Sequence, residues 1–175
     1  MLEQLAKKYI EGDDVTPQLT TPSFTTVGDV LNRWIDWEHD NLPKDLSIIY
    51  TEKPDSYQSS QELHDDIVTN KRIFVFSLFC THPLISEDTN RKFRAVHDYR
   101  HHFESGVIES DFGLYGEFCA YQKAKQDLFA YIWENEPTAA TELYPTLDKI
   151  LCSEIVLQAA VRLYTGEFAD QKIVL

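Results

Sequence analysis

The sequence predicts a mainly α-helical single domain, residues 1–175, with a small two-stranded β element. Apolar residues recur every three or four positions over several long stretches, which is the spacing of one helix face. Only two short runs, residues 46–51 and 73–79, have the composition of strands. Of the 175 residues, 43% are hydrophobic, and a chain of this length buries a sizeable core without disulfides. We expect residues 1–56 to add N-terminal helices and a loop to a core formed by residues 57–175.

The N-terminal stretch is expected to hold two helices joined by a loop. Residues 2–11 place apolar side chains at helical spacing and are followed by Gly12, a common helix terminator. Residues 13–26 contain two prolines and five threonines, a composition typical of a connecting loop. A second helix is predicted over residues 27–40, where an apolar stripe that includes Trp34 recurs at helical spacing.

The β element is expected to enclose one helix. The run 46–51 is short and rich in β-branched and aromatic residues, and the turn-forming sequence EKPDS follows it. Ser59 or Ser60 then caps a helix over residues 61–71, and the second strand follows at 73–79. A strand, a helix and a strand in this order suggest a small two-stranded sheet.

The C-terminal half is expected to consist of long helices. A helix that carries three histidines ends at Gly106, and a second apolar helical run begins near residue 112. Pro145 is expected to open the last long helix, because proline is favoured in a first helical turn. That helix is predicted to end near Thr165, and residues 166–175 to form a tail docked on the domain.

Charge and cysteine content exclude several classes of partner. The formal net charge is −13 and the pI is about 4.7, so nucleic-acid backbones and anionic membranes would repel the protein. No stretch has the length and apolarity needed to span a bilayer. The three cysteines are scattered without metal-site or redox spacing, which is typical of reduced thiols in a cytoplasmic protein. The composition leaves a homo-oligomer open.

Three residues of one helix are candidate metal ligands. His97 and His101 are four residues apart, so their side chains lie about 40° apart on an α-helix and can reach one ion. Asp98 lies about 60° from His101 and can be a third ligand or can orient an imidazole. His102 lies about 140° from His97, a poor geometry for a shared ion unless the helix is distorted there.

Two isolated carboxylates extend this candidate site. Glu117 and Glu154 each stand among apolar or neutral neighbours on separate helices. A lone ionised carboxylate in such surroundings costs several kcal/mol unless it is paired or binds a metal. We therefore expect His97, His101 and Glu117 to bind a divalent cation, with Asp98 as a ligand or a supporting residue. Two imidazoles with carboxylates suit zinc, iron(II) or manganese without choosing between them.

Other roles are expected near the metal. Glu154 is the candidate general base or fourth ligand, because a buried carboxylate beside a metal can be tuned for proton transfer. Arg94, one turn before Asp98, would hold that carboxylate or bind an anionic substrate group. An ordinary buried ion-pair network is the alternative, with Glu117 paired to Arg94 or Arg100 and Glu154 paired to Lys123 or Arg162.

The stretch from Tyr57 onward resembles an uncharacterised domain of phage and bacterial proteins. The pattern of that domain runs H-P-L, N-x-K-F-R-A-V-H-D, a nearby histidine, F-G-x-x-G-E, and a later Glu and Gln. The matching residues are His82, Pro83, Leu84, Asn90, Lys92 to Asp98, Phe112, Gly113, Gly116, Glu117, Glu154 and Gln158. The resemblance implies no established activity. It aligns the second histidine of the family with His102 and a glycine with His101, which leaves open which of the two is a ligand.

A shorter stretch is similar to the metal motif of the coenzyme Q biosynthesis protein family. That family has an all-helical fold and binds a divalent ion and prenylated quinone precursors. The motif H-D-x-x-H followed by G-E is matched by His97, Asp98, His101 and Glu117. This resemblance implies a divalent-metal site, and it covers too little of the chain to imply a substrate.

Two functions of different classes follow from these residues. The first is a metal-dependent enzyme, of hydrolase or lyase type, that acts on a small molecule through open coordination positions. The second is a non-catalytic helical module in which a metal or a buried polar network only fixes the helices. A phosphohydrolase fits less well, because no upstream histidine has convincing spacing and the negative charge is unfavourable for nucleotides.

Overall fold

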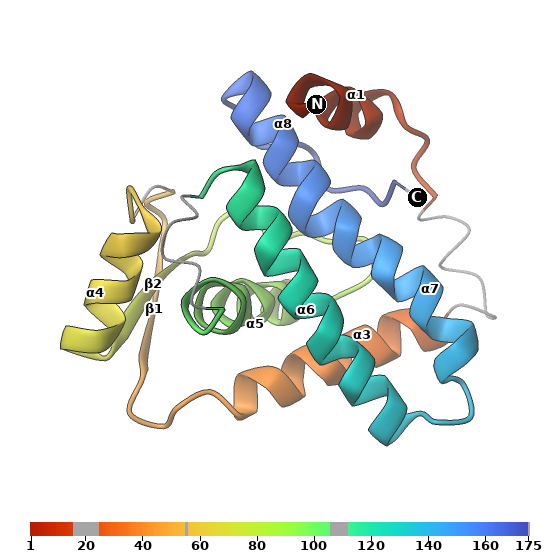
Figure 1. Ribbon diagram of the computed structural model, residues 1–175, viewed down its shortest axis with the longest axis horizontal. Helices are drawn as coiled ribbons and strands as arrows, with labels where there is room; N and C mark the ends of the chain where they lie inside the picture. The colour runs from red at the N-terminus through yellow and green to blue at the C-terminus, as the bar shows by residue number, and fades with distance from the viewer. Residues whose placement is uncertain (16–24, 55, 106–111, 175) are drawn as a thin grey trace.

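A computed structural model describes residues 1–15, 25–54, 56–105 and 112–174. The protein is mainly α-helical with a small parallel sheet (Figure 1), which confirms the predicted fold class. In chain order the elements are α1 Leu2–Glu11, α3 Thr25–Asp40, β1 Ser47–Thr51, α4 Ser60–Asn70, β2 Arg72–Phe76, α5 Glu87–Val96, η1 His97–Phe103, α6 Leu114–Asn135, α7 Ala140–Leu151, η2 Cys152–Leu157 and α8 Gln158–Thr165. Here η denotes a π-helical segment.

Two of the helices are continuous rods that contain a π-helical segment. The first consists of α5 and η1, and the second of α7, η2 and α8, which Figure 1 shows as one long rod beside α6. π-helical turns inside α-helices are rare and are often found at functional sites. The candidate ligand His97 lies in η1, and the candidate base Glu154 lies in η2.

The helices α3, α6 and α7 lie against one another (Figure 1), and the largest hydrophobic cluster of the described residues joins them. Trp34 of α3, Leu128 of α6 and Ile150 of α7 are fully buried in it. Fully burying a side chain of this size stabilises the fold by about 1.5–3 kcal/mol. The helical periodicity of the sequence arises from these buried faces, and the cluster holds α6 in place behind the histidine helix.

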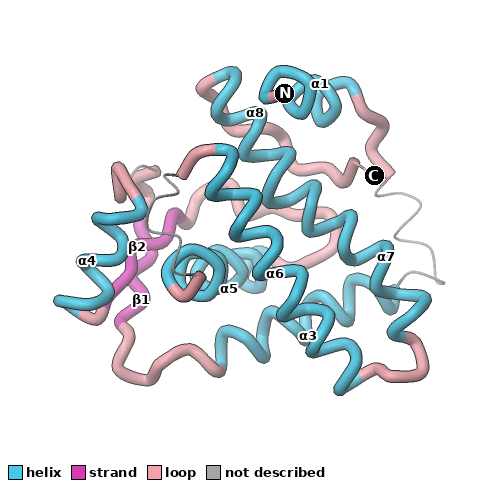
Figure 2. Tube along the Cα trace, in the orientation of Figure 1, coloured by secondary structure: helices cyan, strands magenta, loops and turns pink. Residues whose placement is uncertain are grey.

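The sheet is a compact β–α–β unit. β1 and β2 run parallel with Ser47 opposite Arg72, and α4 forms the crossover between them. Figure 2 shows the two strands between α4 and α5. The Ser59 side chain accepts a hydrogen bond from the Glu62 N–H and caps α4, as the sequence predicted. The unit places the residues that follow β2 against the histidine helix.

The C-terminal segment after α8 packs between α1 and the long rod. The Tyr9 hydroxyl lies 3.0 Å from the carbonyl oxygens of Asp170 and Lys172 and accepts a hydrogen bond from the Lys172 N–H. Ile173 is fully buried, and the Val174 N–H donates to the Ser153 hydroxyl at 3.1 Å. The tail is therefore docked, as expected, and α1 lies against α8 beside it (Figure 1).

One expected boundary was wrong. Pro145 does not open the last long helix, because α7 begins at Ala140 and includes Pro145. Ala140 and Leu143 are buried in the main cluster, and this packing extends the helix upstream of the proline. At the sixth position of α7 the proline has no N–H to donate to the carbonyl one turn earlier, and the buried packing outweighs this cost. Most of the expected loop 13–26, and the expected break at Gly106, lie outside the described residues.

The helices that the structure describes include none with the length and apolarity required to cross a bilayer.

Candidate metal centre

The π-helical segment η1 brings His97 and His102 together. Its hydrogen bonds span five residues, as in the bond from the Glu104 N–H to the Tyr99 carbonyl at 2.9 Å. Because a π-helix turns less per residue than an α-helix, residues five apart fall on one face. The sequence did not predict this π-helical segment. As a result, His97 is paired with His102 and not with His101 as expected.

Glu117 of α6 completes a group of three possible ligands. The Nε2 atoms of His97 and His102 are 2.9 Å apart. Glu117 Oε2 lies 3.2 Å from His97 Nε2 and 3.6 Å from His102 Nε2. The side chains are 17%, 3% and 14% exposed for His97, His102 and Glu117. Glu117 therefore faces the histidines rather than bulk water, and among the described residues these three form the group able to hold a metal ion.

The three ligand atoms have the spacing of one face of a metal coordination shell. The circle through them has a radius of about 1.9 Å, calculated from their three separations, and metal–ligand bonds to His and Glu are about 2.0–2.2 Å long. A cation could thus lie at bonding distance from all three atoms, so the donor set fits a three-ligand site.

Electrostatics couple the two histidines to the carboxylate. Burial alone would raise the pKa of Glu117, but hydrogen bonds from His102 and His97 outweigh it and hold the pKa well below its usual range. Burial likewise opposes protonation of His97, but its hydrogen bond to Glu117 and the Glu117 charge raise the pKa of that imidazole. The group is therefore organised around an ionised carboxylate, the form that binds a cation.

Asp98 lies beside the group on the wall of the cleft. Burial raises the pKa of Asp98 to about 6, against the opposing charges of His97 and His102. Asp98 is outside the three-ligand group. Its position suits an accessory role next to His97 better than direct ligation, the second of the two roles expected from the sequence.

His101 points into the core instead of toward Glu117. Its side chain is fully buried, its ring stacks on Trp34 with centroids 6.2 Å apart, and neither ring nitrogen has a hydrogen-bond partner among the described residues. Burial drives the pKa of His101 well below its usual value. The structure therefore groups His102, in place of the expected His101, with His97 and Glu117, because η1 directs the His101 ring onto Trp34, although its centroid stays 5.7 Å from that of His97.

The candidate ligands form part of the wall of a large cleft. The cleft has a volume of about 620 Å³, which is in the range of small-molecule sites. His97, His102 and Glu117 line it together with Asp98 and Glu154. Its other walls are rich in phenylalanine, namely Phe74, Phe76, Phe79, Phe93, Phe112 and Phe168.

Arg94 lines the same cleft but does not hold Asp98. Its guanidinium donates to the carbonyl oxygens of Phe76, Leu78 and Phe79 at 2.7–2.9 Å. No ion pair joins Arg94 to Asp98 within the described ranges. Burial lowers the pKa of Arg94 against the raising effect of nearby Cys80 and Asp98. Arg94 therefore fixes the segment that follows β2, a role the sequence did not indicate.

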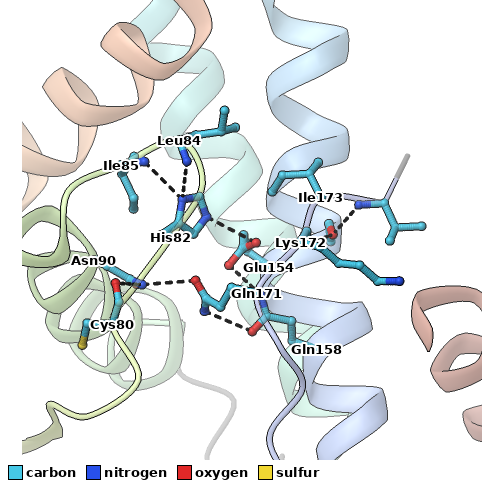
Figure 3. Close-up of polar contacts among 12 residues, drawn as sticks. Cys80, His82, Leu84, Ile85, Asn90, Glu154, Gln158, Gln171, Lys172 and Ile173 are labelled. Atoms are coloured by element: carbon cyan, nitrogen blue, oxygen red, sulfur yellow. Dashed lines mark hydrogen bonds and ion pairs between the residues drawn. The ribbon is translucent and has the colours of Figure 1, made fainter. Parts of the chain in front are cut away.

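Glu154 belongs to a second polar group in the cleft wall (Figure 3). His82 Nε2 lies 3.3 Å from Glu154 Oε1, and the Gln158 amide donates to Glu154 Oε2 at 2.7 Å. Asn90 and Gln171 continue this group. The sequence prediction included His82 only in the H-P-L pattern and did not include Gln171, because contacts between residues so far apart in the chain leave no local pattern.

Among the residues that the structure describes, Arg100 and Lys123 do not form the ion pairs considered as alternatives for Glu117 and Glu154. Arg100 lies 3.4 Å from Glu38 and 2.9 Å from Glu104 rather than near Glu117. Lys123 pairs with Asp127, one turn along α6, rather than with Glu154. Glu117 and Glu154 are instead contacted by histidine and amide groups.

No family model matches the chain, and no curated protein or solved structure is significantly similar to it.

Proposed function

We propose that the protein is a divalent-metal-dependent enzyme, of hydrolase or lyase type, that acts on a small molecule bound in the cleft. His97, His102 and Glu117 would hold the ion. Zinc, iron(II) and manganese all accept two imidazoles and a carboxylate. An ion with open coordination positions supplies Lewis-acid chemistry there, polarising a substrate oxygen or activating water.

One observation carries this proposal. The three ligand atoms lie within 4.8 Å of one another on the wall of a cleft of about 620 Å³. A metal site that only stabilises a fold is usually closed by four protein ligands, whereas a catalytic site keeps a position open toward its substrate. Three ligands beside a cleft of small-molecule size match the second arrangement.

Two further residues of the cleft would have separate roles. Glu154 is a buried carboxylate in the same cleft, and it would accept a proton from the bound molecule. Arg94 would keep the cleft wall in shape through its three carbonyl contacts. The charge of Arg94 also faces a cleft that holds several carboxylates, and would moderate their mutual repulsion.

A structural polar network is the second candidate, and one observation favours it. His97 and His102 are within hydrogen-bond distance of each other, and both approach Glu117, so the three side chains contact one another without a cation. In that case the three residues would stabilise the packing of η1 against α6, and no ion would bind.

Metal analysis separates the two candidates. The wild-type protein, Glu117→Gln and the control Glu142→Gln, whose glutamate is exposed on α7, are purified without chelator and assayed by elemental mass spectrometry. We expect about one divalent ion per wild-type or control chain and a loss of at least about tenfold in Glu117→Gln, since removing a charged ligand weakens metal binding severely.

Zinc, manganese and iron(II) are then titrated into chelator-treated wild-type protein by calorimetry, with iron under anaerobic conditions. Saturable binding of one ion that Glu117→Gln abolishes supports the enzyme proposal. Absence of binding by all three ions, together with a lower melting temperature of Glu117→Gln, would show that the group is a structural network.

A further inference from the structure

Glu154 stands where two sets of hydrogen-bond donors meet. It lies on η2, its side chain is 7% exposed, and it lines both the cleft and the adjoining core beside His82 (Figure 3). A buried carboxylate needs donors or a positive charge around it. Around Glu154 the nearby polar groups belong to His82 and Gln158.

His82 presents a fixed N–H toward Glu154. Its Nδ1 atom accepts hydrogen bonds from the Leu84 N–H at 3.0 Å and the Ile85 N–H at 3.2 Å. A ring nitrogen that accepts cannot carry a hydrogen, so the neutral imidazole must carry it on Nε2. That nitrogen lies 3.3 Å from Glu154 Oε1. The backbone around residues 84 and 85 thereby selects the tautomer that places a donor beside the carboxylate.

A chain of three amides reaches Glu154 from the other side (Figure 3). The Asn90 amide donates to the Cys80 carbonyl at 2.9 Å and to Gln171 Oε1 at 3.3 Å. Gln171 Nε2 then lies 3.4 Å from Gln158 Oε1, and Gln158 Nε2 donates to Glu154 Oε2 at 2.7 Å. A backbone carbonyl only accepts, so the Cys80 contact fixes the orientation of Asn90 and, in turn, of each following amide.

The amide chain ends in a hydrogen bond from Gln158 to Glu154 Oε2, whereas His82 Nε2 lies 3.3 Å from Glu154 Oε1 without hydrogen-bond geometry. Aligned hydrogen bonds of this kind strengthen one another in a low-dielectric interior. A carboxylate has about four lone-pair sites. Glu154 Oε2 accepts from Gln158, and Glu154 Oε1 is buried without a hydrogen-bond partner among the described residues, so the group has room for a donor from the cleft.

The cleft that Glu154 lines also has an aromatic wall. Phe76 stacks on Phe168 with centroids 5.6 Å apart and lies 6.1 Å from Phe79. Phe79 is 70% exposed and adopts a left-handed backbone conformation with φ of 54°, which is costly for a bulky residue and is found where a structure enforces it. Arg94 enforces it here through its contacts with the carbonyls of this segment. The wall therefore offers ring faces to a bound molecule.

We infer that Glu154 is a preorganised hydrogen-bond acceptor in a ligand subsite, and that the ligand is a small aromatic molecule carrying a hydroxyl or N–H donor. The donor would bind the free lone pairs of Glu154, and the ring would lie against the phenylalanine wall. His82 is a positioning residue that acts through Glu154. The inference rests on the proposed function in that both place the ligand in this cleft.

Binding of three simple aromatic probes tests the subsite. Phenol carries a donor, anisole is the same ring with the donor blocked, and benzoate carries a negative charge. Their affinities for wild-type protein, Glu154→Gln, Glu117→Gln and the control Glu142→Gln are measured by ligand-observed NMR titration. We expect the wild-type and control proteins to bind phenol at least about fivefold more tightly than anisole, and benzoate most weakly, because hydrogen bonds to a charged acceptor are strong.

The variants separate this inference from the proposed metal site. Glu154→Gln should bind phenol and anisole about equally, since its neutral side chain lacks the charge, and its metal content should be unchanged. Glu117→Gln should lose metal but keep the preference for phenol. Equal affinity of phenol and anisole for the wild-type protein, no detectable binding of phenol, or an unchanged preference in Glu154→Gln would each overturn the subsite. Retained metal in Glu117→Gln would count only against the metal proposal.

A spectroscopic measurement covers the case in which Glu154→Gln does not fold. In ¹⁵N-labelled wild-type protein, the ring of His82 should show a hydrogen-bearing Nε2 and a bare Nδ1 at neutral pH, and His82→Gln identifies its signals by their loss. A ring with its hydrogen on Nδ1, or on both nitrogens, would contradict the donor arrangement on which the inference depends.

Discussion

His97 and His102 hold their Nε2 atoms 2.9 Å apart although they are five residues apart in the chain. An α-helix would separate their side chains by about 140°. The π-helical segment η1 removes that separation and at the same time turns His101 into the core beside Trp34. One local change in helix geometry thus decides which histidine faces Glu117.

Replacing the two adjacent histidines should therefore have opposite consequences. We expect His102→Leu to lose bound metal by at least about tenfold, because only His97 and Glu117 would remain from the three-ligand group. His101→Leu should keep the metal. It should change the free energy of unfolding by less than about 1 kcal/mol, since it removes ring nitrogens that have no partner among the described residues.

Elemental analysis and urea unfolding of both variants check this prediction. His64→Leu serves as a control on a helix outside the group, where the ring lies beside Asp65. Loss of metal in His101→Leu with retention in His102→Leu would restore the α-helical pairing and reject the one described by η1.

The sequence predicted the participants of the site better than their arrangement. Burial of Glu117 followed from the small and apolar residues around it, and its proximity to His97 agrees with that argument. The sequence did not decide between His101 and His102 as the second histidine of the site, because no local pattern predicts a π-helical turn. The position of Gln171 beside Asn90 depends on docking of the tail, a long-range contact that periodicity cannot encode.

The β–α–β unit, by contrast, was predictable because it depends on local features of the sequence. Its strands and its capped helix are local features, so Ser59 and the run 46–51 predicted them directly. The parallel pairing of β1 with β2 needed only the rule that a helix between two adjacent strands forms a crossover. The start of α7 was missed because buried Ala140 and Leu143 outweigh the local preference of Pro145.

Asp66 should make the stability of this unit dependent on acid. Its carboxylate accepts hydrogen bonds from Tyr57 at 3.0 Å, Arg72 at 2.9 Å and Asn70 at 2.5 Å. Burial alone would raise the pKa of Asp66, but these contacts outweigh it and lower the pKa below its usual value. A lowered pKa in the folded state contributes stability above the ordinary pKa, and that stability is lost as pH falls through the lowered value.

We expect Asp66→Asn to reduce the free energy of unfolding by about 1–3 kcal/mol at pH 7, in line with hydrogen bonds to charged groups. The difference from wild type should shrink as pH falls below about 3.9, the usual value for aspartate. Urea unfolding between pH 7 and pH 2.5 measures it, with exposed Asp65→Asn as control. A difference independent of pH would mean that the charge of Asp66 contributes nothing.

Tyr9 should link α1 to the C-terminal tail. Its hydroxyl contacts the backbone of Asp170 and Lys172, and its side chain is almost fully buried. Tyr9→Phe would leave those backbone groups without this partner, which costs about 1–3 kcal/mol for buried groups. We expect a lower melting temperature and faster amide exchange at Lys172, whereas Tyr164→Phe, at a position 47% exposed, should change neither. Unchanged exchange at Lys172 would argue that other contacts hold the tail.

Arg94 should control the aromatic wall of the cleft. The planar guanidinium reaches three carbonyls at once, and a lysine ammonium at the same position has no fork with which to match them. We expect Arg94→Lys to release the left-handed conformation at Phe79, giving amide exchange at residues 77–80 at least about tenfold faster than in wild type. Arg91→Lys is the matched control, because Arg91 forms an ion pair of 3.4 Å at the surface with Glu87 on the same helix. Since Arg94 lies outside the three-ligand group, metal content should stay unchanged in both variants. Exchange that is equally slow in Arg94→Lys would show that packing against Phe76, rather than the guanidinium, holds the segment in place.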